Sequence, residues 1–321
     1  RDIDYLPDTG SKRVLTTGGH FGYLKIAEGC DKHCTYCIIP KLRGKFRSVP
    51  MERLIAQAED MAEQGVKELI LVAQETTVYG KDLYGKKSLH ILLKKLCEIR
   101  GIRWIRILYC YPEEIYDELI ETIRDEKKIC HYLDIPIQHA SDRILKRMGR
   151  RTSKQELIDI VGKLRKEIPD IVLRTTLITG FPGETEEDHE ELKEFVDEME
   201  FDRLGVFTYS PEENTPAAEM ADQIPEEVKE ERRDELMELQ QEISYDKGQD
   251  RIGQELLVMI EGKVADESAY IGRTYGDAPK VDGYIFVQTG ELLMTGDFAK
   301  VRVTGALEYD LIGVLSDEYT E

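Results

Sequence analysis

Leu69-Ile70-Leu71-Val72-Ala73 is the stretch that decides the fold, because five apolar residues in succession predict a β-strand buried on both faces. A strand with one face in water would alternate apolar and polar residues instead. Strands buried on both faces occur almost only in parallel sheets that helices cover. The run therefore predicts a strand inside an α/β domain.

The same kind of strand recurs along the chain, with helices between. Strands are predicted at six places: 22–27, 69–73, 104–108, 132–135, 172–178 and 203–207. Helices are predicted between them: from Pro50 to Gly65, then at 89–99, 113–125, 153–167 and 186–199. Six strands separated by helices predict a parallel sheet with right-handed crossover connections.

Three of the six cysteines, Cys30, Cys34 and Cys37, lie in one loop just after the first predicted strand. A [4Fe-4S] cluster has four irons, usually ligated by thiolates, so three cysteines leave one iron open to a ligand that is not protein. Structural zinc sites take four ligands, usually as two Cys/His pairs. His33 lies inside the same loop and no second pair exists, so the spacing favours a cluster over zinc.

Length and composition limit the remaining possibilities. The chain has 321 residues, enough for two domains, and 34% are charged against about 25% in typical domains. No run of about 18 apolar residues and no signal peptide are present, so we expect a cytoplasmic protein without a membrane partner. Cys97, Cys110 and Cys130 are spaced too irregularly for a disulfide framework, and we expect reduced, buried thiols.

Polar residues follow several of the predicted strands. In barrels of parallel strands the chemistry lies at the C-terminal ends of the strands, where these residues would meet. Gln74 and Gln138 each follow a strand, and an amide offers both donors and acceptors to a ligand. The loop 179–184 has a structural alternative, because Thr185 and Asp188 fit a capping box for the next helix.

The cysteine loop resembles the signature of radical S-adenosylmethionine (SAM) enzymes, including the aromatic Tyr36 before the last cysteine. The resemblance implies a partial (βα)6 TIM-like barrel. It also implies that the open iron binds SAM, and that one electron cleaves SAM into methionine and a 5′-deoxyadenosyl radical. We expect the cofactor-binding residues to be Tyr36, Gln74, Glu75, Gln138, Arg174 and Gly180. Arg174 could pair with the SAM carboxylate, but the alternation along its strand equally allows it to face a helix.

Three segments resemble the methylthiotransferases that modify a ribosomal protein. They are AQETTVYG at 73–80, DIPIQHAS at 134–141 and Glu213; tRNA-modifying relatives typically carry a GQNVN type segment, QSGS and a basic residue there. The resemblance implies insertion of a methylthio group at the β-carbon of an aspartate in a small-subunit ribosomal protein. It also implies a flavodoxin-like, ferredoxin-like or chemical electron donor. The alternative is methylthiolation of a tRNA nucleoside.

A second [4Fe-4S] cluster is part of the same resemblance. In relatives, three cysteines of a domain that precedes the radical domain bind it. Residues 1–29 contain no cysteine, so we expect the second cluster only in an N-terminal domain that is missing here. We therefore expect this chain to cleave SAM without completing methylthiolation.

The C-terminal part has a different pattern. A charged helix is predicted at 226–247, followed by short strands at 255–260, 284–287 and 298–303 that suggest a small β-barrel. This barrel resembles the TRAM domain that ends the chains of this family. We expect a tail at 1–20, a radical SAM domain at 21–225, a connecting helix at 226–247 and the barrel at 248–321.

The net charge of the barrel indicates which kind of partner it would bind. Residues 248–321 hold 14 Asp and Glu against 6 Lys and Arg, a net charge of −8 within a chain of −20. Binding of nucleic acid depends on Lys and Arg, so nucleic acid is an unlikely partner and a basic ribosomal protein is expected. The acidic docking residues expected are Asp266, Glu267, Asp277 and Asp282. A tRNA substrate would instead be favoured by a basic strip of Arg143, Lys146, Arg147, Arg150 and Arg151.

Overall fold

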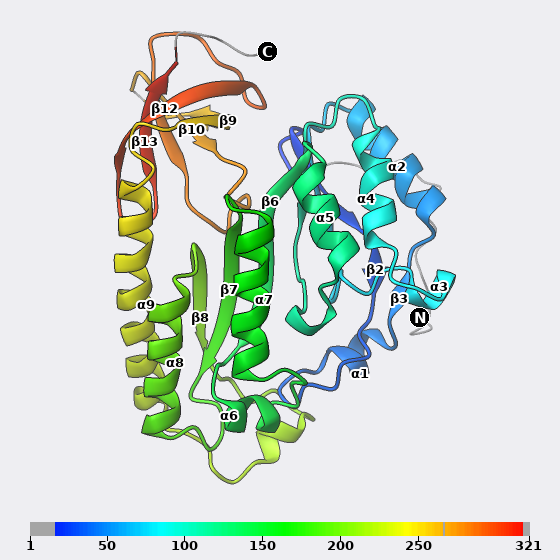
Figure 1. Cartoon of the computed structure of the whole chain (residues 1–321), viewed down its shortest axis with the longest axis vertical. Helices are drawn as coiled ribbons and strands as arrows, with labels where there is room; N and C mark the ends of the chain where they lie inside the picture. Colours follow the sequence, from blue (N-terminus) through cyan, green and yellow to red (C-terminus); the bar gives the residue numbers. More distant parts are fainter. Residues whose placement is uncertain (1–16, 266, 317–321) are drawn as a thin grey trace.

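The computed structural model describes residues 17–265 and 267–316. Its two larger β structures are joined by one long helix (Figure 1), and β2 (Ala27–Glu28) pairs with β3 (Arg47–Ser48) in a separate two-stranded sheet. The largest is a six-stranded parallel sheet in the order β1-β4-β5-β6-β7-β8. Its strands are β1 Phe21–Lys25, β4 Glu68–Val72, β5 Trp104–Ile107, β6 Ile129–Gln138, β7 Val172–Thr179 and β8 Arg203–Thr208. Within the described residues no pairing joins β1 to β8, so the sheet is an open, partial barrel, as predicted.

Helices cover the outer face of this sheet. The longer ones are α2 Met51–Glu63, α4 Leu89–Cys97, α5 Asp117–Asp125, α7 Lys154–Glu167 and α8 Glu186–Met199. Thr185 and Asp188 form the predicted capping box at the start of α8, and Ser153 and Glu156 form another at α7. Among the described residues, no helix is both long enough and apolar enough to span a membrane.

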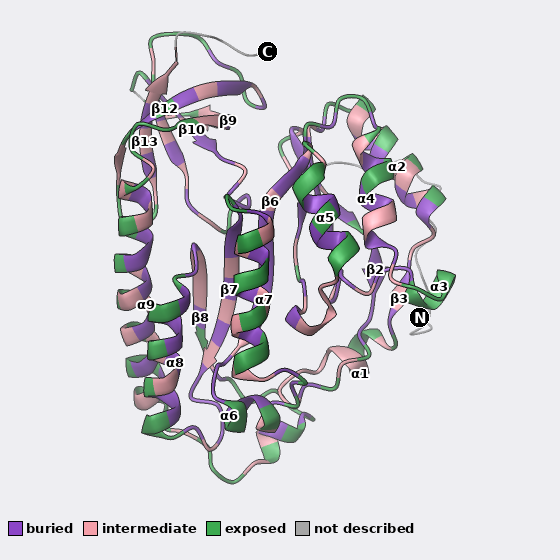
Figure 2. Ribbon diagram, in the orientation of Figure 1, coloured by how far each residue is buried: buried purple, intermediate pink, exposed green. Residues whose placement is uncertain are grey.

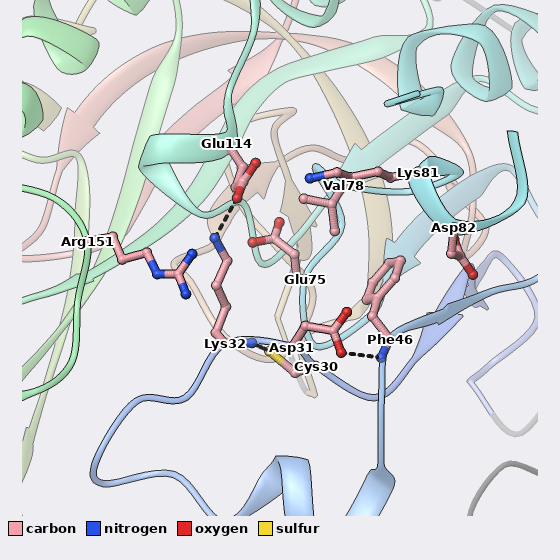
Figure 3. A pocket seen from close by; sticks show the side chains of 10 residues that line it. All are labelled: Cys30, Asp31, Lys32, Phe46, Glu75, Val78, Lys81, Asp82, Glu114 and Arg151. Atoms are coloured by element: carbon pink, nitrogen blue, oxygen red, sulfur yellow. Dashed lines mark hydrogen bonds and ion pairs between the residues drawn. The ribbon is translucent and has the colours of Figure 1, made fainter. Parts of the chain in front are cut away.

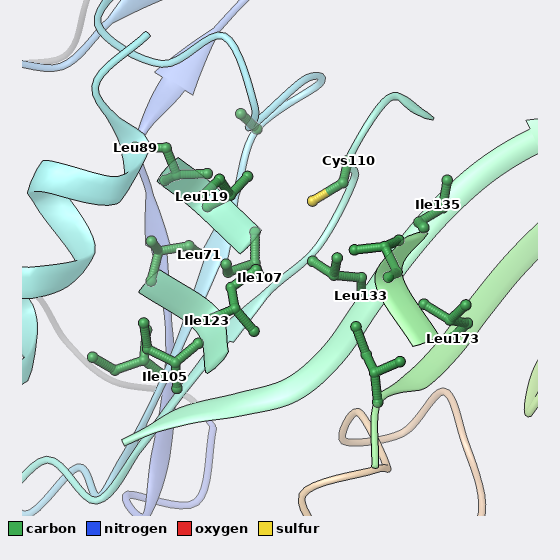
Figure 4. Close-up of a cluster of buried hydrophobic side chains, with 14 of the residues drawn as sticks. Leu71, Leu89, Ile105, Ile107, Cys110, Leu119, Ile123, Leu133, Ile135 and Leu173 are labelled. Carbon is green, nitrogen blue, oxygen red and sulfur yellow. The ribbon is translucent and has the colours of Figure 1, made fainter. Parts of the chain in front are cut away.

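Alternate residues of the strands form the core between sheet and helices. Leu71, Ile105 and Leu133 are fully buried there against helix residues such as Leu89 and Ile123 (Figure 4). The helices are buried on the side that faces the sheet and exposed on the other side (Figure 2). The opposite, inner face of the same strands also carries charged residues, among them Arg106, Asp134 and Arg174. This inner face is what the open barrel encloses.

Several elements differ from the sequence prediction. The predicted helix 113–125 is a 3-10 turn, η1 Pro112–Glu114, and then α5, because Ile115 and Tyr116 between them have extended backbone. The fourth strand is longer than predicted and includes Gln138. A short helix that was not predicted follows it, α6 Asp142–Arg147.

The C-terminal part is a closed five-stranded barrel with its own core, which includes Val258, Ile285 and Val301. The strands are β9 Glu255–Lys263, β10 Ala269–Arg273, β11 Ile285–Gln288, β12 Phe298–Ala306 and β13 Leu311–Leu315. β10 and β13 were not predicted. The connecting helix α9, Glu226–Gln249, packs on β8 and α8.

Buried ion pairs join this barrel to the N-terminal ends of the parallel strands. Glu68, the first residue of β4, accepts from Arg106 Nε at 2.7 Å and from Arg273 Nη2 of β10 at 2.7 Å. All three side chains are fully buried. Arg273 Nε also donates to Glu261 of β9 at 2.6 Å. The C-terminal barrel therefore covers one end of the open barrel, and α1 (Ile39–Arg43) lies near the other end (Figure 1).

Two of the four predicted docking acids belong to this interface, so the prediction was wrong for them. Asp277 Oδ1 accepts from Arg203 Nη2 at 2.6 Å, and Asp282 accepts from the Tyr132 hydroxyl at 2.8 Å and pairs with Arg174. Both acids sit in loops, where the sequence suggests solvent, but both face a cation of the other domain. Glu267 is exposed, and Asp266 lies outside the described residues.

Candidate active site

The loop with three cysteines lies at the end of the open barrel opposite to the C-terminal barrel. It connects β2 (Ala27–Glu28) to α1. Backbone bonds fix it: Cys30 N donates to Gly44 O at 3.2 Å, and Thr35 N donates to Met148 O at 2.9 Å. The loop is thus held from two sides by segments that are distant in the sequence.

Gly29 and Gln74 set the entry to this loop. Gly29 has φ +80°, and a Cβ there would lie 2.2 Å from Lys45 O, so only glycine fits. The Gly29 N–H donates to Gln74 Oε1 at 2.9 Å. Gln74, predicted as a cofactor contact, therefore positions the cysteine loop, and its contact with a cofactor stays a prediction.

The three thiols are free, and Cys30 lines a cavity. Cys30 and Cys34 are buried and Cys37 is partly exposed. Burial raises the pKa of the Cys30 thiol to about 11. Among the described residues, no three His, Cys, Asp or Glu side chains converge on one point where a metal ion would sit. The choice between a cluster and zinc therefore rests on the sequence, which places three cysteines in one loop without a second Cys/His pair.

A cavity of about 300 Å³ opens beside Cys30 (Figure 3). The cysteine loop lines it on one side and the exit of β4 on the other. The lining residues are Cys30, Asp31, Lys32, Phe46, Glu75, Val78, Lys81, Asp82, Glu114 and Arg151. Lys32 Nζ donates to Glu114 Oε1 at 2.6 Å, so two of the opposite charges in the lining neutralise each other.

Glu75 is the most deeply buried acid of this cavity, with 1% of its surface exposed. Its Oε1 accepts from the Thr77 backbone N–H and hydroxyl, while Oε2 has no hydrogen-bond partner among the described residues. Burial raises its pKa to about 7. A buried carboxyl with a free oxygen is costly unless a ligand supplies a donor. The site is therefore suited to a cationic group.

The other predicted contacts lie around the same end, except Arg174. Tyr36 packs edge-on against Phe181, with ring centroids 6.4 Å apart. Gln138 ends β6 with φ 72°, a left-handed conformation that is strained for a residue with a side chain. Gly180 has a structural explanation, because a Cβ there would lie 2.1 Å from Lys229 Cγ of α9.

Arg174 is not brought to the cavity. Its Nη1 donates to Asp134 Oδ1 at 2.7 Å, and its Nε lies 3.3 Å from Asp282 Oδ1 of the C-terminal barrel. The reason is its position, since Arg174 is the third of eight residues in β7 and lies nearer the N-terminal end of the strand. We therefore leave Arg174 out of the cofactor site.

The predicted basic strip does not form a free basic surface. Arg143 pairs with Asp188, and Arg147 Nη2 lies 3.3 Å from Asp222 Oδ2. Arg150 is buried beside the cysteine loop. Two of the five cations are therefore paired, a third is buried, and Lys146 and Arg151 are exposed.

Comparison with known proteins agrees with this geometry. Residues 24–196 match the Radical SAM superfamily, and residues 252–315 match the TRAM domain. The chain is 67% identical over 313 residues to the ribosomal protein uS12 methylthiotransferase RimO of Lachnoclostridium phytofermentans. That match covers 98% of this chain and 71% of the relative. The chain belongs to the RimO family.

Other RimO proteins are also similar. The chain is 54% identical to RimO of Clostridium botulinum, over 96% of this chain and 69% of the relative. It is 56% identical to RimO of Clostridium perfringens, over 95% and 68%. These matches confirm the predicted class of radical SAM methylthiotransferase with a ribosomal-protein substrate.

Solved structures show the same fold at low identity. Coproporphyrinogen III oxidase (HemN) of Escherichia coli superimposes with a TM-score of 0.54 at 16% identity, covering 88% of this chain and 67% of that one. The methyltransferase TsrM of Kitasatospora setae gives a TM-score of 0.52 at 16% identity, covering 67% and 41%. Both confirm a radical SAM type of partial barrel.

Proposed function

We propose that Cys30, Cys34 and Cys37 hold a [4Fe-4S] cluster with one open iron, and that the chain binds SAM in the cavity beside Cys30. The single observation that carries this proposal is the juxtaposition of three free cysteines on one fixed loop with a buried carboxyl across the cavity. When bound, the cluster supplies one electron for the reductive cleavage of SAM. Release of 5′-deoxyadenosine from SAM by the reconstituted chain tests the proposal.

We propose that the RimO protein to which this chain belongs methylthiolates the β-carbon of an aspartate in uS12. That carbon has no activated hydrogen, which explains the need for a radical. The RimO relatives support uS12 as the substrate, and the aspartate is our proposal. Mass spectrometry of uS12 after reaction tests it, since the added methylthio group must map to an aspartate rather than to a tRNA nucleoside.

The chain's own residues have distinct roles in this proposal. The Glu75 carboxyl pairs with the ammonium of SAM, Gln74 holds the cysteine loop, and Tyr36 and Gln138 border the site. A carboxylate and an ammonium form a charge-assisted hydrogen bond in a water-poor cavity.

Glu75→Gln is expected to weaken SAM binding about ten- to hundredfold, because a hydrogen bond to a charged group contributes about 1.5–3 kcal/mol. Equilibrium dialysis of the cluster-loaded chain with SAM measures the change. Glu52→Gln, at an exposed position of α2, is the matched control and should bind SAM as the parent does. Equal affinity of Glu75→Gln and the parent would show that the ammonium binds elsewhere.

We also propose that the second cluster, which would provide the sulfur, is not bound by this chain. The other cysteines are Cys97 at the end of α4, Cys110 after β5 and Cys130 in β6, on three separate elements. Reconstitution should therefore give about four irons per chain, as one cubane requires. Methylthiolated uS12 formed by this chain alone would contradict the proposal.

The electron for SAM cleavage would come from a flavodoxin-like or ferredoxin-like protein, or from dithionite.

The acidic C-terminal barrel is proposed to attract the basic substrate protein. Glu267, Glu291 and Glu308 are exposed on the C-terminal barrel, unlike Asp277 and Asp282, which belong to the interface. A protein bound there must still reach the cysteine loop at the other end of the open barrel. The eight residues of β7 span roughly 26 Å of that path at about 3.3 Å per residue.

Changing Glu267, Glu291 and Glu308 together to Lys is expected to slow association with uS12 about tenfold at low salt, because oppositely charged surfaces steer encounter. Stopped-flow binding at rising ionic strength measures this, and the difference should shrink as salt screens exposed charges. The control reverses three exposed acids of α2, Glu52, Glu59 and Glu63. Association that does not respond to salt would contradict docking by charge.

A further inference from the structure

Arg150 is buried in a segment that is bonded to the cysteine loop, although its position in the sequence suggests an exposed cation. It follows α6, and only 1% of its side chain is exposed. The segment before it is bound to the loop, since Thr35 N donates to Met148 O at 2.9 Å and Thr35 Oγ1 donates to Arg147 O at 2.8 Å. Gly149 has φ +73°, and a Cβ there would lie 3.0 Å from His33 O. A side chain at position 149 would therefore crowd the cysteine loop.

The guanidinium of Arg150 is only partly compensated. Its Nη2 donates to Pro136 O at 2.9 Å, and Glu113 Oε2 lies 3.9 Å away. The guanidinium carbon lies 4.3 Å from the ring centroid of Tyr111. Its Nε and Nη1 are buried without a hydrogen-bond partner in the described structure. A buried cation with two unused donors is destabilising unless something anionic completes its surroundings.

The side chains around this cation belong to the cysteine loop and its neighbours. The Tyr111 ring stacks on Arg150, and the Tyr111 hydroxyl lies 3.7 Å from Cys34 Sγ. An arginine guanidinium is not deprotonated in proteins. Arg150 therefore keeps its charge on the Cys34 side of the loop.

We propose that the buried charge of Arg150 lies beside the [4Fe-4S] cluster and raises the reduction potential of the cluster. This inference rests on the proposed function. Three thiolates make a cluster anionic, and one electron taken from dithionite or a flavodoxin-like donor makes it more so. A buried positive charge favours the more negative form, and cluster potentials depend on net charge, hydrogen bonds to sulfur and burial.

A purely structural role predicts a different outcome. If Arg150 only ties its own segment to Pro136 O, its loss would lower stability or iron content without changing the potential of the clusters that remain. The potential therefore separates the two roles.

The test compares the reconstituted chain with Arg150→Met, Arg150→Gln and Arg150→Lys by redox titration, following the EPR signal of the reduced cluster. The neutral variants should lower the ratio of reduced to oxidised cluster at least tenfold at the same applied potential. For one electron this corresponds to about 59 mV. Arg150→Lys, which keeps the charge, should stay close to the parent. Arg150→Gln keeps an amide donor for Pro136 O, so a folding defect of the Met variant does not prevent the measurement.

Lys146→Met is the matched control, because it removes a positive charge from the same segment at an exposed position of α6. Solvent screens that charge, so the potential should not move. Neutral variants with the parent's potential, or equal shifts in the Lys and neutral variants, would overturn the proposal. Absence of a [4Fe-4S] signal from the parent chain would instead contradict the proposed function.

Discussion

Changing Cys30, Cys34 and Cys37 together to Ala is expected to lower the iron content of the reconstituted chain from about four atoms to none. The same change should abolish release of 5′-deoxyadenosine from SAM. The reason is that these are the three cysteines that share one loop beside the cavity. Iron analysis and chromatography of the nucleoside measure the two effects.

The control for this change is Cys97→Ala, at a partly exposed position at the end of α4. It should keep the iron and the SAM cleavage of the parent. A triple variant that still retains about four irons would show that other ligands hold the cluster.

Glu68→Gln is expected to lower the free energy of unfolding by about 3–5 kcal/mol, the usual effect of removing one partner from a buried ion pair. Glu68 is fully buried between Arg106 and Arg273, so the substitution leaves two buried guanidinium groups without their shared carboxylate. Urea denaturation at neutral pH measures the loss. Glu255→Gln, which removes an exposed partner of Arg302, is the control and should change stability little.

The pH dependence of this effect has a definite sign. Burial alone would raise the pKa of Glu68, but Arg106 and Arg273 hold it below the ordinary value. A carboxyl whose pKa is lower in the folded state stabilises above its unfolded pKa and loses this contribution as pH falls through the folded pKa. The difference between parent and variant should therefore be full at neutral pH and shrink in acid below about pH 4. A difference that is constant from neutral to acid pH would contradict the role of the charge.

Buried ion pairs between the open barrel and the C-terminal barrel fix how the two domains are arranged. Glu68 belongs to the open barrel, whereas Arg273 and Glu261 belong to the C-terminal barrel. The pairs Arg203–Asp277 and Arg174–Asp282 lie across the same boundary. Charged groups buried in this way constrain the geometry of both domains, because each needs its partner at a defined distance. We therefore expect the two domains to unfold together.

Local patterns in the sequence determined much of the fold. The apolar run at 69–73 predicts a strand buried on both faces, and β4 has that burial. The Thr185 and Asp188 pair predicts the start of α8. The spacing of the cysteines predicts that three thiols share one loop. Each of these signals lies within about a dozen residues, where backbone sterics and burial act directly.

The tertiary structure decided which charges are buried. Asp277, Asp282 and Arg150 lie in polar stretches that suggest exposure, yet each side chain is buried against residues distant in the chain. Glu68 and Arg273 are separated by 205 positions, and no local pattern relates them. Strands β10 and β13 were likewise missed, because closing a barrel depends on partners from other strands. Sequence patterns report the neighbours of a residue along the chain, whereas burial of a charge depends on what folding places opposite it in space.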